Sequence, residues 1–398
     1  MPQAFEGIRV IDFTQVLAGP FAVMQLALLG AEVVKIEHPQ GGDQTRGSQD
    51  GKHKGMSASF LGMNLNKKSL TLNLKSPEGV EIVKRLVATA DVVVENFKAG
   101  TMQRVGLNYE LLKEIKPDLI FCSITGYGQK GPKAGEAAYD GAIQASSGMM
   151  SQTGYLETGP TRTGYMPVDM STALNAAFAI SAALFRRAET GLGQQIDVAM
   201  MDTAIVMQAS QFSEYLNEDF LPGLLGNASP TLHPTANVFE TCDSFIQVLA
   251  LRQAQVEKLF DALGLGDQIS MAKYSTPGAR IKYSAEVSNL IGSALKLQST
   301  EHWMRILSSI GIPVAEIRSL PDVMTDPQLE YRGVFETFPS LIEDKNENTV
   351  VKAGYITDED GPTYRSPPPS LGKDTEEILR SVGYEESEIN QFSEDGVI

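Results

Sequence analysis

The sequence predicts an α/β protein with an open, mostly parallel, Rossmann-like sheet in a large domain, together with a smaller α+β domain. Short runs of β-branched residues alternate with helical segments through the first half of the chain, which is the pattern of a parallel sheet covered by helices. A chain of 398 residues is also too long for one ordinary hydrophobic core, so two domains are expected.

The alternating pattern can be followed from residue 9 to residue 124. Strands are expected where β-branched residues cluster, and helices where apolar residues recur on one side. The expected strands span residues 9–13, 32–37, 70–74, 91–95 and 119–124, and the expected helices span residues 20–30 and 77–90. Ligands of such sheets bind beyond the carboxyl ends of the strands. The residues that closely follow a strand, and are therefore expected at this crevice, are Val16, Leu17, Asn96, Phe97 and Tyr127.

The second half of the chain is expected to begin with a loop and a long helix. Residues 148–164 are rich in glycine, which indicates a loop, and the alanine-rich residues 173–188 are expected to form a buried helix. A shift toward Pro, Gly, Asn and Thr at residues 221–234 indicates a linker. The following residues, about 235–321, mix an extended run with helical stretches, which predicts a second unit.

Composition excludes several classes of function and location. The formal net charge of −16 argues against general nucleic-acid binding, which requires a basic surface. No stretch of about 18 uninterrupted apolar residues occurs, so no membrane span is expected. The first residues lack the pattern of an export signal, and the two cysteines do not suggest a disulfide scaffold. A reducing cytoplasm is therefore the expected location.

The charges are unevenly distributed along the chain. Residues 50–104 carry nine Lys or Arg against five Asp or Glu, whereas residues 316–398 carry nineteen acidic residues against seven basic ones. A small polyanion could bind the first of these regions. Most of its basic residues are nevertheless expected to be merely solvated, a group that includes Lys67, Lys68, Lys84 and Arg85.

Several familiar motifs are missing from the sequence. Gly-x-Gly-x-x-Gly does not follow the first strand, and no P-loop, His-Glu-x-x-His or Gly-x-Ser-x-Gly motif occurs. The four histidines are scattered, and neither cysteine belongs to a metal-like spacing. A metal site or a hydrolytic triad is therefore not expected.

Asp169 is the most informative single residue. It lies in Gly164-Tyr-Met-Pro-Val-Asp169-Met-Ser-Thr, just before the alanine-rich helix. A carboxylate here can accept hydrogen bonds from the first free N–H groups of the helix, and the helix dipole favours its ionised form. Asp169 therefore either caps the helix, as Ser171 or Thr172 also could, or acts as a nucleophile toward an activated acyl group. The segment alone leaves both roles open.

A series of ordered motifs extends through nearly the whole chain. They include Gly7-Ile-Arg-Val-Ile-Asp-Phe-Thr, Ala18-Gly-Pro20, Leu29-Gly-Ala-Glu-Val-Val-Lys-Ile-Glu37, Gly42-Asp43, Arg46-Gly47, Asp91-Val-Val-Val-Glu-Asn-Phe97, Tyr139-Asp140, Gly191-Leu-Gly193-Gln and Gly311-Ile-Pro-Val. Through these motifs the chain resembles the class III CoA-transferases, the family that contains formyl-CoA transferase and carnitine CoA-transferase.

The resemblance implies an activity and a mechanism. Asp169 matches the family's catalytic aspartate, which attacks an acyl-CoA thioester to give a mixed anhydride and then an aspartyl-CoA thioester, before the incoming acid reverses these steps. The side chain of Gln15 and backbone N–H groups near the glycine-rich loop are expected to stabilise the oxyanions. Coenzyme A thioester is then a substrate, and neither a metal nor a tightly bound cofactor is expected.

The same resemblance assigns positions for CoA. The matching residues are Val16, Ala18, Leu72, Lys75, Asn96, Phe97, Lys98, Arg104, Tyr139 and Asp140. Lys75 and Arg104 suit phosphate groups, and Phe97 offers an apolar face to adenine or pantetheine, although core packing explains Phe97 and Leu72 equally well.

Differences from formyl-CoA transferase bear on the substrates. His38 and Ala137 replace an arginine and a lysine of that enzyme, which leaves phosphate contacts at these positions open. The run of glycines that formyl-CoA transferase uses as a lid is absent around residues 223–237, so oxalate and formate are not favoured. We expect a small mono- or dicarboxylate acceptor, with succinyl-CoA or acetyl-CoA as the donor.

Two other functions are weighed against CoA transfer. The α-methylacyl-CoA racemases of the same superfamily use a Gly-His-Asp motif, which aligns with Ala138-Tyr139-Asp140. Because Tyr139 replaces the histidine, one of two acid–base groups is missing, and transfer is favoured over racemisation. A non-catalytic CoA-binding protein would need the crevice but not the carboxylate of Asp169.

Finally, the resemblance implies an assembly and a division into domains. Family members form interlocked dimers, so a homodimer is expected. Residues 1–224 together with 327–398 are expected to form the large CoA-binding domain, and residues 225–326 the small domain. The expected partners are an acyl-CoA, a small carboxylic acid and a second copy of the chain, with no nucleic acid and no membrane.

Overall fold

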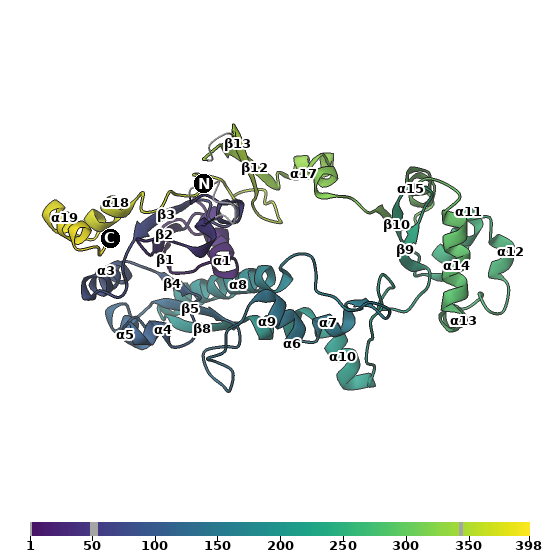
Figure 1. The fold of residues 1–398 in the computed structure, drawn as a ribbon, viewed down its shortest axis with the longest axis horizontal. Helices are drawn as coiled ribbons and strands as arrows, with labels where there is room; N and C mark the ends of the chain where they lie inside the picture. The colour runs from purple at the N-terminus through teal and green to yellow at the C-terminus, as the bar shows by residue number, and fades with distance from the viewer. Residues whose placement is uncertain (1, 48–54, 342–344) are drawn as a thin grey trace. The chain divides into compact units, whose positions relative to one another are not determined.

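The computed structural model describes residues 2–47, 55–341 and 345–398, and it divides into two compact units (Figure 1). Unit 1 comprises Met1–Met149, Thr163–Phe212 and Pro327–Ile398, and unit 2 comprises Met150–Arg162 and Ser213–Asp326. Each unit has its own hydrophobic core.

A six-stranded sheet forms the centre of unit 1. Its strand order is β3-β2-β1-β4-β5-β8, and every strand runs parallel to its neighbours. The strands are β1 (Arg9–Asp12), β2 (Glu32–Glu37), β3 (Lys67–Thr71), β4 (Val92–Glu95), β5 (Ile120–Thr125) and β8 (Gln194–Ala199). This sheet confirms the predicted α/β fold.

Helices cover both faces of the sheet (Figure 1). On one face α1 (Ala18–Leu28) packs against α8 (Pro167–Thr190), and every residue of α1 is buried, as expected for a helix in which Gln25 is the one polar side chain. On the other face lie α3 (Pro77–Ala88), α5 (Tyr109–Ile115), α18 (Thr375–Ser381) and α19 (Glu386–Glu394). The carboxyl-terminal helices therefore complete the same core as the amino-terminal strands.

Shorter elements complete unit 1. They are η1 (Gln44–Arg46), α2 (Ala58–Leu61), α4 (Thr101–Arg104), α6 (Asp140–Ser146), α9 (Met200–Met207), α17 (Pro327–Arg332) and the hairpin of β12 (Phe335–Pro339) and β13 (Glu347–Val351). The chain passes between the units through α7 (Met149–Gln152) and α10 (Ala209–Glu218).

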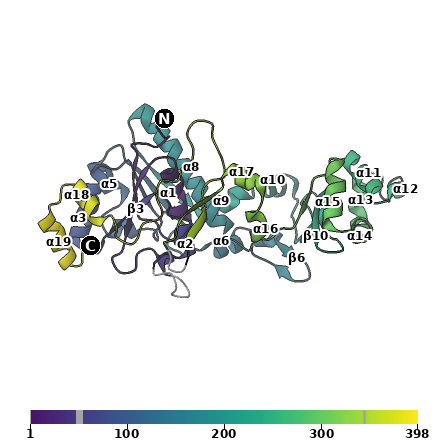
Figure 2. The same ribbon diagram turned by 90° about the horizontal axis from the view of Figure 1, so that it is seen from above.

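Unit 2 is an α+β structure, as predicted for the smaller domain (Figure 2). Its antiparallel sheet has the order β11-β10-β9, formed by β9 (Ala236–Glu240), β10 (Phe245–Leu249) and β11 (Val314–Glu316). Phe239, Ile246 and Val248 of this sheet pack on the helices of the unit. The helices of unit 2 include α11 (Gln253–Ala262), α12 (Gly266–Ile269), α13 (Pro277–Lys282), α14 (Ser284–Leu295), α15 (Thr300–Ser309) and α16 (Leu320–Met324).

Three elements differ from their sequence-based expectations. The strand expected at residues 70–74 is β3, which begins at Lys67 because this lysine is buried and paired rather than solvated. The helix expected at residues 173–188 is α8, which begins six residues earlier at Pro167. The segment expected as a loop at residues 148–164 also contains α7 and a short hairpin of β6 (Gly154–Tyr155) and β7 (Gly159–Pro160).

Within the described part of the chain, α8 alone is long and apolar enough to cross a membrane by length and composition. Core helices of globular proteins pass the same test, and one side of α8 packs in this way. Ala173, Ala176 and Ile180 are buried in the core that α8 shares with α1 and the sheet.

Candidate active site

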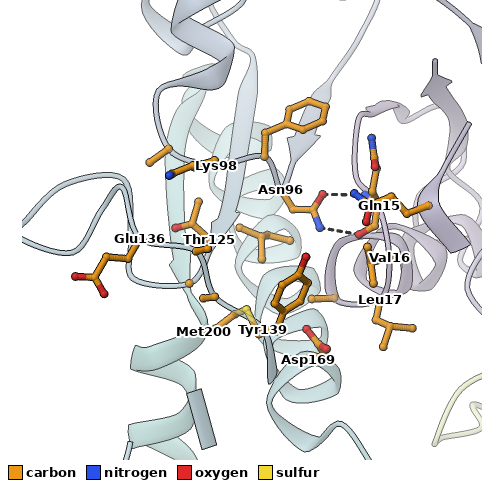
Figure 3. Close-up of a pocket in the computed structure, with 18 of the residues that line it drawn as sticks. Gln15, Val16, Leu17, Asn96, Lys98, Thr125, Glu136, Tyr139, Asp169 and Met200 are labelled. Carbon is orange, nitrogen blue, oxygen red and sulfur yellow. Dashed lines mark hydrogen bonds between the residues drawn. The ribbon is translucent and has the colours of Figure 1, made fainter. Parts of the chain in front are cut away.

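A pocket of about 360 Å³ lies in unit 1 beyond the carboxyl ends of β1, β4, β5 and β8 (Figure 3). It is lined by Gln15, Val16, Leu17, Ala18, Gln44, Asn96, Phe97, Lys98, Ala99, Ile124, Thr125, Gly126, Ala134, Glu136, Ala137, Ala138, Tyr139, Asp169 and Met200. Its place agrees with the crevice expected for an open parallel sheet.

The turn after β1 forms one wall of the pocket. The N–H of Gln15 donates to Asn96 Oδ1 at 2.8 Å, and Asn96 Nδ2 donates back to the carbonyl of Gln15 at 2.8 Å (Figure 3). Asn96 follows β4, the strand next to β1, so this pair of bonds ties two neighbouring strand ends together. Gln15 lines the pocket, and its side-chain amide has no hydrogen-bond partner among the described residues.

Asp169 reaches the pocket from the first turn of α8. The N-cap of this helix is Met166, whose side chain makes no capping bond. Instead, Asp140 Oδ2 accepts hydrogen bonds from the N–H groups of Val168 and Asp169, at 2.8 and 3.0 Å. The capping role considered for Asp169 is therefore wrong, because Asp140, 28 and 29 residues earlier, satisfies these donors.

Asp140 is itself buried and held in place. Its side chain is 6% exposed, and Gln144 Nε2 donates to its Oδ1 at 2.5 Å. The Oε1 of Gln144 in turn accepts from the N–H of Thr163 at 3.1 Å. The start of α8, and with it the position of Asp169, is thus set by side chains of α6.

The two carboxyl groups affect each other. Burial raises the pKa of Asp169 to about 6, and the nearby carboxylate of Asp140 adds to this increase. Burial and the neighbouring charge thus outweigh the effect of the helix dipole, which favours the ionised form. Asp169 is still mostly ionised at neutral pH, and it is more basic than an ordinary aspartate.

The structure gathers eight of the twelve predicted site residues at this pocket. They are Gln15, Val16, Ala18, Asn96, Phe97, Lys98, Tyr139 and Asp169. Lys98 and Tyr139 are exposed there, Tyr139 at 72%, so both are accessible to a ligand.

The other four predicted residues lie elsewhere. Leu72 is 1% exposed in the core below β3, so its side chain faces no solvent. Lys75 and Arg104 are exposed outside the pocket lining, and the guanidinium of Arg104 donates to Thr101 Oγ1 at 2.8 Å. Asp140 acts on the start of α8, as described above. Whether these residues also contact CoA stays a prediction.

Several lining residues were not predicted from the sequence. Thr125 ends β5 and Gly126 follows it, Ala134 and Glu136 come later in the same loop, and Met200 follows β8. The rule that ligands bind beyond strand ends could have found the first group, since a strand was expected up to residue 124. Tyr127, which was expected at the crevice, packs against a small core cluster instead.

No group of three or more His, Cys, Asp or Glu in residues 2–47, 55–341 and 345–398 is arranged to hold a metal ion. The lining instead offers two carboxyl groups, three side-chain amides, one ammonium group and an apolar wall. Such a lining suits a ligand with an amide-containing chain and an acyl group.

Replacing Asp140 with Asn should lower the pKa of Asp169 below 6, because the substitution removes the neighbouring charge while keeping an oxygen for the helix N–H groups. The pKa can be measured by NMR with ¹³Cγ-labelled aspartate, assigned with Asp169→Asn. Asp202→Asn is the control, since Asp202 also lies in the first turn of a helix but does not shift Asp169. An unchanged pKa in Asp140→Asn would contradict this electrostatic coupling.

Comparison with known proteins identifies the family. The family model "CoA-transferase family III" matches residues 5–375. A succinate–glutarate CoA-transferase of Agrobacterium fabrum is 36% identical over 384 residues, which cover 94% of this chain and 95% of that protein. A succinyl-CoA:glutarate CoA-transferase of Mus musculus is 36% identical over 403 residues, which cover 99% of this chain and 90% of that protein.

A solved structure agrees with these matches. A CAIB/BAIF family protein from Brucella suis superimposes with a TM-score of 0.85 and 33% sequence identity, and the match covers 96% of this chain and 100% of that one. The resemblance inferred from the motifs is confirmed. The chain belongs to CoA-transferase family III and is an enzyme of that class.

Proposed function

We propose that the enzyme transfers CoA through two covalent intermediates on Asp169. The carboxylate attacks the thioester carbonyl of the donor, and the C–S bond breaks to give a mixed anhydride and CoA thiolate. The thiolate then attacks the aspartyl carbonyl, which releases the donor acid and leaves an aspartyl-CoA thioester. The acceptor carboxylate attacks this thioester and the two steps run in reverse, so that Asp169 is restored. Each intermediate is activated, so the energy of the thioester is conserved.

The observation that carries this proposal is the environment of Asp169. Its carboxyl group borders the pocket, and its oxygens make no hydrogen bond to any described residue. A pKa of about 6 leaves the group ionised at neutral pH and more basic than usual. Nucleophilic carboxylates of this kind form acyl intermediates.

The amide of Gln15 is the proposed donor to the developing oxyanions. It lines the same pocket as Asp169 and has no other partner among the described residues. An amide N–H that is already in place when charge develops stabilises the transition state without reorganisation. The main-chain N–H groups of Gln15 and Val16 are less suited to this role, because they already bond to Asn96 and Asp43.

For CoA we retain the predicted residues as a proposal. Val16, Ala18, Asn96 and Phe97 would contact the pantetheine arm or the base, and Lys98 with Tyr139 would lie at the exposed side. Four of the predicted residues do not line the pocket, so a contact with CoA would have to occur outside it: Leu72, Lys75, Arg104 and Asp140. No other cofactor is required by the proposed steps.

Among the acids expected from the sequence, we propose dicarboxylates, with succinyl-CoA as the donor. The relatives named for succinate and glutarate support this choice. Glutarate should therefore accept CoA from succinyl-CoA with a kcat/KM at least about tenfold above that of acetate. The polar groups that bind the second carboxylate of a dicarboxylate would have no partner when a monocarboxylate is bound. Mass spectrometry of the new CoA esters measures the ratio, and equal values for both acids would contradict the proposal.

We further propose that the enzyme is an interlocked homodimer. The exposed side of α8 carries Leu174, Phe178 and Phe185, at 54%, 72% and 74% exposure, which is more apolar surface than a single copy ordinarily leaves on one helix. The mass in solution, measured by light scattering, should be that of two chains. A mass of one chain at micromolar concentration would contradict the dimer.

Two further expectations are retained as proposals. A cytoplasmic location fits the unpaired thiols of Cys122 and Cys242. The large CoA-binding domain would combine residues 1–224 with 327–398, and the small domain would be residues 225–326. The carboxyl-terminal helices support the first grouping, since they pack on the amino-terminal sheet.

Replacing Asp169 with Asn should reduce kcat for CoA transfer by at least about a thousandfold, because an amide cannot form the anhydride. Asp202→Asn is the matched control: Asp202 stands at the third position of α9, as Asp169 does in α8, but it does not line the pocket. The control should retain transfer, and transfer at the wild-type rate by Asp169→Asn would contradict the mechanism.

The same mechanism fixes the pH dependence of the wild-type enzyme. Because Asp169 must be ionised and its pKa is about 6, kcat/KM should level off above pH 6 and fall about tenfold per pH unit below it. A plateau that extended to pH 4 would mean that another group, with an ordinary pKa, is the nucleophile.

A further inference from the structure

The turn after β1 has an unusual backbone. Val16 adopts φ = 71°, in the left-handed region that valine rarely enters. Such a conformation is strained, and it persists only when the surrounding structure holds it. Val16 also lines the pocket, together with Gln15 and Leu17 on either side of it.

Three side chains from other parts of the sheet hold this turn. Lys35 Nζ donates to the carbonyl of Thr14 at 2.6 Å, and the N–H of Val16 donates to Asp43 Oδ1 at 3.2 Å. Between them, Asn96 binds both main-chain groups of Gln15 at 2.8 Å. Four consecutive main-chain polar groups are thus bonded to side chains.

Lys35 and Asp43, hereafter the buried pair, also bind each other. Lys35 Nζ lies 2.9 Å from Asp43 Oδ2, and both side chains are 0% exposed. Burial opposes both charges, but the carboxylates of Asp12 and Asp43 raise the pKa of Lys35, and the ammonium group of Lys35 lowers the pKa of Asp43. Both residues are therefore charged, and removing either one unbalances the buried charges around the other.

Neither member of the buried pair lines the pocket. Their hydrogen bonds reach the pocket wall through the main chain of the turn, at Thr14 and Val16. Asp43 also accepts from the N–H and the hydroxyl of Thr45, which follows the lining residue Gln44. An ion pair that only stabilised the fold at the strand ends would not need a hydrogen bond to the strained residue, Val16. The contact of Asp43 falls on the N–H of Val16 itself.

We propose that Lys35 and Asp43 are positioning residues, which hold Val16 in its strained conformation and thereby fix the wall of the CoA pocket beside Asp169. The proposal rests on the proposed function, since it assumes that CoA binds in this pocket. Displacement of such a wall by about 1 Å is enough to lower turnover severalfold or more.

A double-mutant cycle with Asp43→Asn and Val16→Gly tests the proposal. Glycine adopts positive φ without strain, so a turn with Val16→Gly no longer needs the buried pair to hold it. In the wild-type background, Asp43→Asn should raise the Kd for CoA and lower kcat/KM by about tenfold each. In the Val16→Gly background the same substitution should change both by less than about threefold. Equal fold-changes in the two backgrounds would overturn the proposal.

Asp91→Asn is the matched control. One oxygen of Asp91 accepts from the N–H of Arg9 at 2.7 Å and the other pairs with Arg187 at 2.8 Å, so it combines a main-chain contact and an ion pair as Asp43 does. It precedes β4, at the opposite end of the strands from the pocket. Asp91→Asn should lower the melting temperature but leave Kd and kcat/KM unchanged. An effect of Asp43→Asn confined to the melting temperature would also overturn the proposal.

A replacement variant and a binding measurement independent of turnover complete the experiment. If Asp43→Asn does not fold, Lys35→Met/Asp43→Asn replaces it in both backgrounds, because removing both charges leaves no unpaired one, and the same fold-changes are expected. The Kd for CoA, measured by calorimetry without an acyl group, does not depend on turnover. A failure of the Asp169 mechanism therefore leaves this reading of the buried pair unaffected.

Discussion

The structure of the active site depends on charges buried beneath it. Lys67 pairs with Asp12 at 2.9 Å, Lys35 pairs with Asp43 at 2.9 Å, and Arg46 pairs with Glu37 at 2.6 Å. Asp12 and Glu37 are the last residues of β1 and β2. Three cations thus face three carboxylates with almost no solvent. Since a buried charge without a partner is costly, this network permits few arrangements of the strand ends. The turn that borders the pocket is attached directly to it.

A second constraint acts from the opposite wall. Asp140 satisfies the first N–H groups of α8, so Asp169 does not have to cap the helix. Burial raises the pKa of Asp169, and the charge of Asp140 adds to this increase. Because the pKa of Asp169 is higher in the folded protein than in the unfolded chain, the free energy of unfolding decreases as the pH rises from the ordinary pKa of an aspartate to about 6. The fold therefore maintains a reactive carboxylate at the expense of stability, as functional sites commonly do.

The fold was largely predictable, because β-branched runs mark five strands of the central sheet and apolar periodicity marks its helices. β3 was misplaced because Lys67 and Lys68 look like solvated residues, and only the folded structure shows that Lys67 is buried against Asp12. The site was predictable where residues follow strands, as at Val16 and Asn96. The role of Asp140 was not, because it depends on a contact between residues 28 positions apart.

The most direct test of the account asks whether CoA becomes attached to Asp169. The enzyme is incubated with succinyl-CoA without an added acceptor, and the intact protein and its peptides are weighed by mass spectrometry. The account predicts an adduct with the mass of CoA less one water, on the peptide that contains Asp169 and absent from Asp169→Asn. An adduct on a different residue, or turnover with no adduct while Asp169→Asn remains active, would contradict it.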